Sequence, residues 1–73
     1  MRTVDEMGDY FFTKKRSLES INLKIVNVYM STDLISICKN KPRIIEWDDN
    51  NPLRFAGVPV IEVTGENYFE VGV

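Results

Sequence analysis

Apolar residues recur at helical spacing near the start of the chain. Val4, Met7 and Phe11 are separated by three and four positions, and residues with this spacing lie on one face of a helix. The pattern predicts a helix over residues 4–15. It leaves one alternative open, in which a frayed tail leads into a short strand at residues 10–12.

Both ends of this predicted helix carry residues typical of helix termini. Thr3 and Glu6 have the Thr-x-x-Glu form of a capping box, in which each side chain satisfies a free backbone N–H. Lys14, Lys15 and Arg16 come near the other end, where cations are favoured because of the helix dipole. We therefore expect a capped N-terminus and a cationic C-terminus.

Residues 21–30 are rich in β-branched side chains and follow a short connector at residues 17–20. Such a composition predicts a strand over residues 21–30. Its alternation changes phase, because one face would carry Ile21, Leu23 and Ile25 and the other Val26, Val28 and Met30. Either a bulge shifts the register, or the strand is central and covered on both faces.

A second, shorter helix is predicted over residues 32–40. Residues 31–33 are Ser-Thr-Asp, which is typical of a helix start, and Pro42 prevents the helix from continuing. Cys38 lies on the apolar side of this helix, so we expect it to be a small buried residue. A further strand is predicted at residues 43–47.

The rest of the chain reads as short extended segments separated by turns. We predict a loop at 48–52, an extended segment at 53–55, a strand at 58–63, a turn at 64–67 and a final strand at 68–73. Pro59 has no backbone N–H to donate, which favours a sheet edge or a bulge for its strand. The turn has hairpin length, so residues 58–73 are expected to form a hairpin of the core sheet.

These elements predict the fold class α+β, with a mostly antiparallel sheet of three to five strands and two short helices on one face. The 73 residues form one domain. We expect residues 1–16 to be a helical or partly flexible N-terminal segment and residues 21–73 to be the core.

Composition excludes several kinds of site. The chain has no histidine and one cysteine, so it can form neither an internal disulfide nor a Cys/His zinc site, and no histidine can act as a catalytic base. The acidic residues Glu46, Asp48 and Asp49 lack the spacing of an EF-hand and read as a solvated turn. We expect no enzyme activity, no cofactor and no metal.

No apolar run reaches the roughly 18–20 residues that span a bilayer, and the N-terminus carries acidic residues where a signal peptide would be apolar. We therefore expect a cytoplasmic protein without a membrane partner. The formal net charge is −2, but residues 1–45 hold eight basic and five acidic residues, whereas residues 46–73 hold one basic and six. Either the two halves interleave in space, or the surface is polarised and steers a charged partner.

Five residues are candidates for contact with a protein partner. Trp47, Arg54 and Tyr68 belong to residue types enriched in binding hot spots. Phe55 accompanies them, and the strand of Pro59 could accept a partner's strand if it lies at an edge. Core packing is an equally good interpretation of Trp47 and Phe55, because a small domain fills its core with large aromatic residues.

A nucleic-acid interface is a further alternative. Lys14, Lys15 and Arg16 follow three aromatic residues at 10–12, and basic residues beside aromatic rings can hold a phosphate backbone and stack bases. Solvated charges at a helix end explain the same residues. The net negative charge argues against nucleic acid as the main partner.

Residues 53–63 contain a Gly-Val-Pro-Val segment that follows a strand, a short helix and a loop. This order resembles small proteins of tailed bacteriophages, and it is similar to a Gly-x-Pro-Val strand of phage major capsid proteins, with residues 28–34 as the matching first half. The chain is much shorter than a capsid subunit. The resemblance covers residues 25–63 and implies a phage origin, with no catalytic residues to transfer.

Together these observations lead to one main hypothesis and two alternatives. The main hypothesis is a phage-encoded, non-enzymatic protein that binds a host protein in the host cytoplasm, as an inhibitor, a modulator or a trigger of host defence. It would use a sheet edge and exposed aromatic residues. The alternatives are a virion assembly component that acts by self-association, and a nucleic-acid-binding module.

Overall fold

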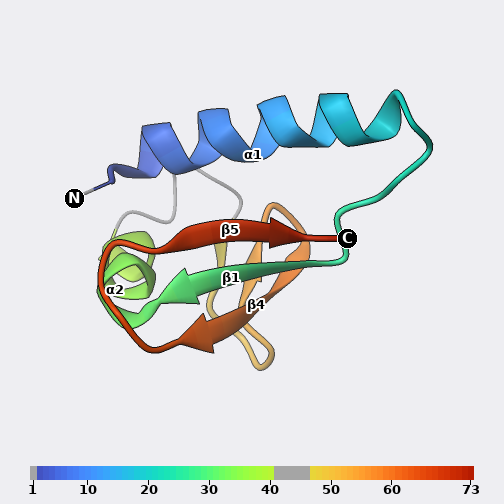
Figure 1. Ribbon diagram of the computed structural model, residues 1–73. Helices are drawn as coiled ribbons and strands as arrows, with labels where there is room; N and C mark the ends of the chain where they lie inside the picture. Colours follow the sequence, from blue (N-terminus) through green and yellow to red (C-terminus); the bar gives the residue numbers. More distant parts are fainter. Residues whose placement is uncertain (1, 41–46) are drawn as a thin grey trace.

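The computed structural model describes residues 2–40 and 47–73. In chain order the elements are α1 (Val4–Glu19), β1 (Asn27–Ser31), α2 (Thr32–Asn40), β2 (Trp47–Asp48), β3 (Arg54–Phe55), β4 (Val58–Val63) and β5 (Phe69–Gly72) (Figure 1). The strands form one sheet in the order β2-β3-β4-β1-β5. Its pairs are antiparallel except for the parallel pair of β1 and β4, so the predicted α+β class is confirmed.

Helix α1 begins as predicted and ends later than predicted. The Thr3 hydroxyl accepts a hydrogen bond from the Glu6 backbone N–H at 3.1 Å, and the Glu6 carboxylate accepts one from the Thr3 N–H at 3.1 Å. These bonds complete the capping box and lower the pKa of Glu6. The helix then runs on through most of the predicted connector at residues 17–20, and the alternative of a frayed tail is not what the structure shows.

The end of α1 explains why the predicted strand at residues 21–30 begins too early. Asn22 has a φ of 62°, and its backbone N–H donates to Glu19 at 3.1 Å while the N–H of Leu23 donates to Leu18 at 2.9 Å. This pair of bonds around a left-handed residue is a Schellman motif. The motif includes residues 21–23, which were predicted to be the start of the strand, so β1 starts only at Asn27.

The apparent change of phase within residues 21–30 is therefore a boundary between two elements. Ile21, Leu23 and Ile25 precede β1, while Val28 and Met30 lie within it and are fully buried. No bulge is needed to account for the pattern. The strand is central, because β1 pairs with both β4 and β5, but it is not covered on both faces as the second interpretation proposed.

The predicted hairpin of residues 58–73 does not form, because β1 lies between its two strands (Figure 1). Val28 pairs with Val60 on one side and with Val71 on the other. The segment between β4 and β5 crosses the end of β1, where the Ser31 N–H donates to the Tyr68 carbonyl at 3.0 Å. Apolar alternation predicts the strand Val58–Val63 with its observed bounds, but it carries no information about which strands are neighbours.

Strand β4 spans Val58–Val63, as predicted, but Pro59 does not place it at an edge. Pro59 is opposite Arg54 of β3, and the neighbouring Val60 N–H donates to the Leu53 carbonyl at 2.8 Å. Alternate N–H groups of a strand point to opposite sides, so Pro59 stands at a position that makes no hydrogen bond to β3. Its missing N–H faces β1 instead, at the start of the β1–β4 ladder, whose first pair is Val28 and Val60, so no bond within that ladder is lost.

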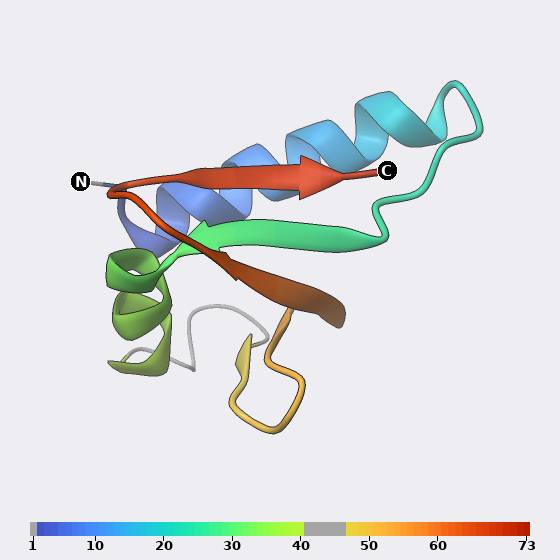
Figure 2. The same ribbon diagram turned by 60° about the horizontal axis from the view of Figure 1, so that its bottom comes forward.

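One face of the sheet carries the core. The buried apolar residues come from α1 (Val4, Met7, Phe11), β1 (Val28, Met30), α2 (Leu34, Ile35, Cys38) and β2, β3 and β5 (Trp47, Phe55, Phe69). Both helices therefore pack on the same face, and in Figure 2 α1 passes behind β5 while α2 lies at the end of β1. Among the described residues, no helix covers the other face, and none is long and apolar enough to cross a membrane.

Asn22→Ala is expected to lower the free energy of unfolding by about 1 kcal/mol, because a side chain with a Cβ and no local hydrogen bond disfavours the left-handed conformation. Asn22→Gly should match or exceed the wild-type stability. Urea unfolding followed by the fluorescence of the buried Trp47 measures both. An equal loss of stability in the two variants would show that the backbone conformation is not the cause.

Cys38 is expected to resist Ellman's reagent in the folded protein. Its side chain is fully buried, its sulfur lies 4.0 Å from that of Met30, and burial raises the pKa of the thiol to about 11. The predicted core role is therefore confirmed. The modification rate at pH 8 should rise with urea in parallel with unfolding, and rapid modification without urea would contradict this burial.

Candidate interaction face of the sheet

The face of the sheet opposite the core carries a set of half-exposed side chains. Tyr29 pairs with Ile61, and Ser31 with Val63, and paired residues of neighbouring strands share a face. Because side chains alternate along β4, Pro59 also lies on this face. Arg54 of β3 is paired with Pro59 and therefore lies on the same face. We call this surface, made of Tyr29, Arg54, Pro59, Ile61, Val63 and Tyr68, the open face.

The open face contains a hollow of about 260 Å³ lined by Tyr29, Val63, Thr64 and Tyr68. Beside it, Ile61 is 42% exposed and Tyr68 is 48% exposed. Two phenol rings and a branched aliphatic side chain therefore surround a concave site that is open to solvent. Such walls suit an apolar side chain of a partner.

One end of this hollow is acidic. Glu66 is exposed and lies two residues before the hollow-lining Tyr68, whereas Glu62 is opposite Met30 and therefore belongs to the other face of the sheet. The Asp33 carboxylate accepts hydrogen bonds from the Ser31 hydroxyl and, at 2.9 Å, from the Asn67 N–H, and these bonds lower its pKa. Asp33 and Glu66 give this end of the open face an acidic character, which favours a cationic partner.

The structure separates the five predicted partner-binding residues into two groups. Arg54, Pro59 and Tyr68 lie on the open face. Trp47 is 8% exposed and Phe55 is fully buried, with the Phe55 ring 5.2 Å from that of Phe69. Of the two interpretations left open for this pair, the structure supports core packing, because both side chains project from β2 and β3 toward the helices.

The sequence offered a signal for the residues that were missed. Tyr29 alternates with the buried Val28 and Met30, and Ile61 and Val63 belong to the strand that was correctly predicted. Period-two alternation therefore assigns them to the second face. What the sequence could not show is that the helices leave this face uncovered and that Tyr68 returns to it.

The outer edge of β5 is partly closed, which bears on the predicted docking of a strand at a sheet edge. The Glu70 carboxylate accepts hydrogen bonds from the N–H of Val71 at 3.0 Å and from the hydroxyl of Tyr10 at 2.7 Å. The side chain thereby occupies a backbone donor that a partner strand would need. Docking of a partner on the open face is therefore better supported than pairing of a partner strand with β5.

The basic residues of α1 do not form one surface. Consecutive helix residues project about 100° apart, and Lys14 lies over the Tyr10 ring at 5.7 Å, whereas Lys15 lines a separate pocket. Phe11 is buried in the core. The arrangement adds no support to the nucleic-acid alternative, which stays a prediction.

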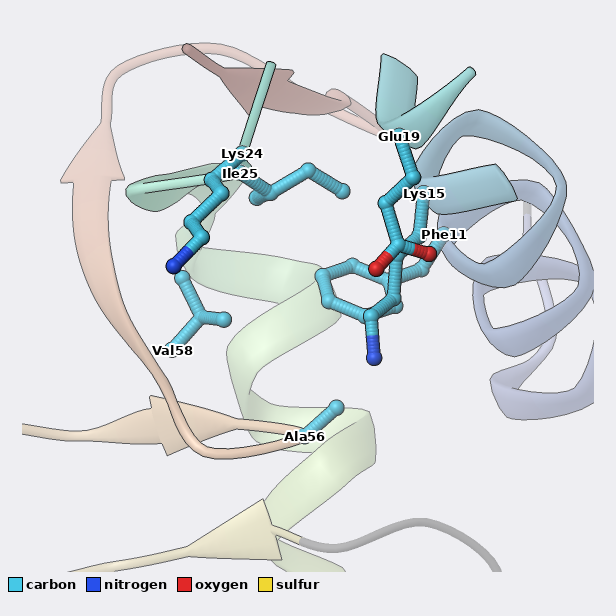
Figure 3. A pocket seen from close by; sticks show the side chains of 7 residues that line it. All are labelled: Phe11, Lys15, Glu19, Lys24, Ile25, Ala56 and Val58. Carbon is cyan, nitrogen blue, oxygen red and sulfur yellow. The ribbon is translucent and has the colours of Figure 1, made fainter. Parts of the chain in front are cut away.

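That separate pocket lies between α1, the segment before β1 and the β3–β4 turn (Figure 3). It has a volume of about 200 Å³ and is lined by Phe11, Lys15, Glu19, Lys24, Ile25, Ala56 and Val58. Apolar side chains form its floor. Lys15 and Glu19 project from α1 on one side, and Lys24 lies on the other.

The acidic turn has local partners. Asp49 accepts a hydrogen bond from the Trp47 indole at 3.3 Å and forms an ion pair with Lys39 at 3.8 Å, and Asp48 accepts one from the Asn50 N–H at 3.0 Å. Glu46 lies outside the described residues. Within residues 2–40 and 47–73, no cluster of three or more metal-ligating side chains is present.

No protein-family model matches the chain, and neither curated proteins nor solved structures yield a match. The resemblance to phage proteins therefore stays a prediction. The function has to be argued from the geometry of the described surfaces.

Tyr10→Phe is expected to lower the free energy of unfolding by about 0.5–1 kcal/mol at pH 7, because it removes a partly exposed hydrogen bond to a charged group. The bond from Tyr10 is the main cause of the lowered pKa of Glu70. A carboxyl whose pKa is lowered in the folded state stabilises the fold above its ordinary pKa of about 4.3, and this stabilisation is lost as the pH falls through the lowered value.

The difference between Tyr10→Phe and the wild type should therefore shrink below pH ~4. Urea unfolding at a series of pH values measures it, with Tyr68→Phe as a matched control that should show no such trend. A difference that stays constant from neutral to acidic pH would exclude Glu70 as its source.

Proposed function

We propose that this chain is a protein-interaction domain that holds a partner on its open face and performs no chemistry itself. The observation that carries the proposal is the hollow between Tyr29, Val63 and Tyr68, next to the exposed Ile61. Exposed aromatic and aliphatic side chains around a concavity are the usual anchors of protein interfaces. A small domain gains nothing in its own stability from exposing them.

The rigidity of the open face supports this role. Tyr29 lies on β1, which is paired on both sides, and Tyr68 is tied to Ser31 by two hydrogen bonds of 3.0 Å, one from the Ser31 N–H and one to the Ser31 hydroxyl oxygen. A surface that is ordered before binding loses little conformational entropy when the partner docks. The acidic surroundings favour a partner that presents an apolar side chain flanked by cations.

The resemblance to phage proteins directs the search for this partner to bacterial proteins. Under the proposal, the domain would occupy a cationic and apolar patch of a host protein. Inhibition, modulation and triggering of host defence would each follow from such binding, depending on the partner.

Tyr68→Ala is expected to abolish the capture of a bacterial partner, because it removes one wall of the hollow. Phe12→Ala is a matched control, since Phe12 and Tyr68 are both 48% exposed but Phe12 projects from α1. The immobilised wild type and both variants are compared in pulldowns from bacterial lysate, and the binding of the identified partner is then measured with purified proteins.

We expect the dissociation constant to rise about tenfold or more for Tyr68→Ala and to stay unchanged for Phe12→Ala. Circular dichroism shows whether each variant is folded. If the wild type captures no partner, or if Tyr68→Ala and Phe12→Ala bind it equally well, the open face is not the docking surface.

A further inference from the structure

The pocket beside α1, shown in Figure 3, is not used by the proposed function. Its lining consists of four apolar residues, Phe11, Ile25, Ala56 and Val58, and three charged residues, Lys15, Glu19 and Lys24. Val58 lies two residues before Val60, which pairs with the buried Val28. Because side chains alternate along a strand, the pocket is on the face of the sheet that carries the core, and it is separate from the open face.

The apolar part of the pocket has room for one ring or one branched side chain. Its volume is about 200 Å³, and a cavity of about 150 Å³ holds a benzene molecule. The wall that Phe11 forms is fixed, because this residue is only 2% exposed and its ring lies 5.4 Å from that of Phe55 in the core. A ligand that fills this part therefore carries an aromatic or branched aliphatic group.

The β3–β4 turn contributes an apolar wall at a position where alanine is unusual. Phe55 pairs with Val58, so Ala56 and Gly57 form a two-residue hairpin loop, and their φ angles are 51° and 81°. Loops of this kind prefer Asn, Asp or Gly at the first of these positions. The methyl group of Ala56 points into the pocket (Figure 3). An apolar residue is accounted for at this strained position if the pocket holds an apolar group.

The charged residues lie on two sides of the pocket. Lys15 and Glu19 project from α1, and Lys24 lies opposite them (Figure 3). The first two are four positions apart on a helix and are therefore neighbours on one face. The ion pair that the structure shows within residues 2–40 and 47–73 is that of Lys39 with Asp49, so the three charges of the pocket are not paired with one another. The pocket thus offers a cation and an anion side by side, with a second cation across from them.

This arrangement of charges matches the head group of an α-amino acid. The ammonium and the carboxylate of an amino acid are bonded to one carbon, so they also lie side by side. The carboxylate has two oxygens, which fit between Lys15 and Lys24, while the ammonium faces Glu19. Hydrogen bonds between ionised groups are stronger than those between neutral groups. A plain carboxylic acid would meet repulsion from Glu19, and a plain amine would meet it from both lysines.

We infer that this pocket binds a free α-amino acid with an aromatic or branched aliphatic side chain. The side chain of the ligand fills the space between Phe11, Ala56 and Val58, and its charged head group lies at the side chains of Lys15, Glu19 and Lys24. The inference does not rest on the proposed function, because the pocket and the open face share no residue.

Binding is tested by titration of the ¹³C-labelled protein with L-phenylalanine, followed by the methyl signals in the NMR spectrum. The methyl groups of Ile25, Ala56 and Val58 should shift and saturate, because the ring of the ligand lies beside them. We expect a dissociation constant of about 1 mM or tighter, and no shift for Val63, which lines the hollow of the open face. Absence of saturation, or shifts confined to Val63, would overturn the inference.

Three related compounds test the two parts of the ligand separately. L-Alanine keeps the head group but has too small a side chain, N-acetyl-L-phenylalanine lacks the cation, and L-phenylalaninamide lacks the anion. Each should bind about fivefold or more weakly than L-phenylalanine. Equally tight binding of the N-acetyl compound would show that the site takes a simple anion, and equally tight binding of L-alanine would show that the apolar part is not used.

Glu19→Gln gives a test that general damage to the fold cannot imitate. The change should weaken the binding of L-phenylalanine about fivefold and strengthen that of N-acetyl-L-phenylalanine, because the carboxylate that attracts the ammonium also repels a simple anion. Lys24→Gln should weaken both ligands. Arg16→Gln is the matched control, since Arg16 is exposed on α1 and does not line the pocket. Unchanged binding of both ligands by Glu19→Gln would contradict the assigned role of this carboxylate.

The two sites are also separated by the variant that tests the open face. Tyr68→Ala should bind L-phenylalanine as tightly as the wild type does, because Tyr68 is not part of the pocket. If Tyr68→Ala loses the amino acid, the ligand occupies the hollow and the inference is wrong.

Discussion

The architecture depends on the hydrogen bonds of one buried polar residue, Ser31. Its N–H donates to the Tyr68 carbonyl, and its hydroxyl accepts from the Tyr68 N–H and donates to Asp33. Because β1 ends at this residue and α2 begins at the next, these bonds join the central strand, the second helix and the segment before β5 at one point. A buried polar group lowers the stability of the fold unless it is hydrogen-bonded in this way.

This junction also decides where the open face becomes concave. Tyr68 is drawn to the end of β1, so its ring stands beside Tyr29 and Val63 instead of extending the line of β5. The hollow is thus a by-product of the crossing between β4 and β5.

The local elements could be predicted from the sequence to the extent that local chemistry fixes them. The helix Thr32–Asn40 and the strand Val58–Val63 were predicted with their observed bounds, because a helix-start signature, a proline and a glycine turn mark their ends. The capping box at Thr3 was equally local. The end of α1 was missed because Asn22 in a left-handed conformation looks like any polar residue within an apolar stretch.

The candidate site was less accessible to sequence reasoning, since it depends on long-range pairing. The placement of β1 between β4 and β5 brings Tyr29, Ile61 and Tyr68 together on one uncovered face. No local sequence pattern shows that these strands are neighbours. Residue type alone, in contrast, suggested Trp47 and Phe55 as partner-binding residues. Both are large aromatic residues that fill the thin core of this small domain.

The central position of β1 has a consequence for how the chain folds during synthesis. Val28 pairs with Val60 and Val71. Neither side of β1 can therefore be paired until most of the chain has been synthesised. Helices α1 and α2 can form early, but their apolar faces stay exposed until then. Contacts between distant residues slow folding because the intervening chain must first be closed into a loop. The nascent protein therefore presents its unprotected helices to other proteins in the cell before its sheet is complete.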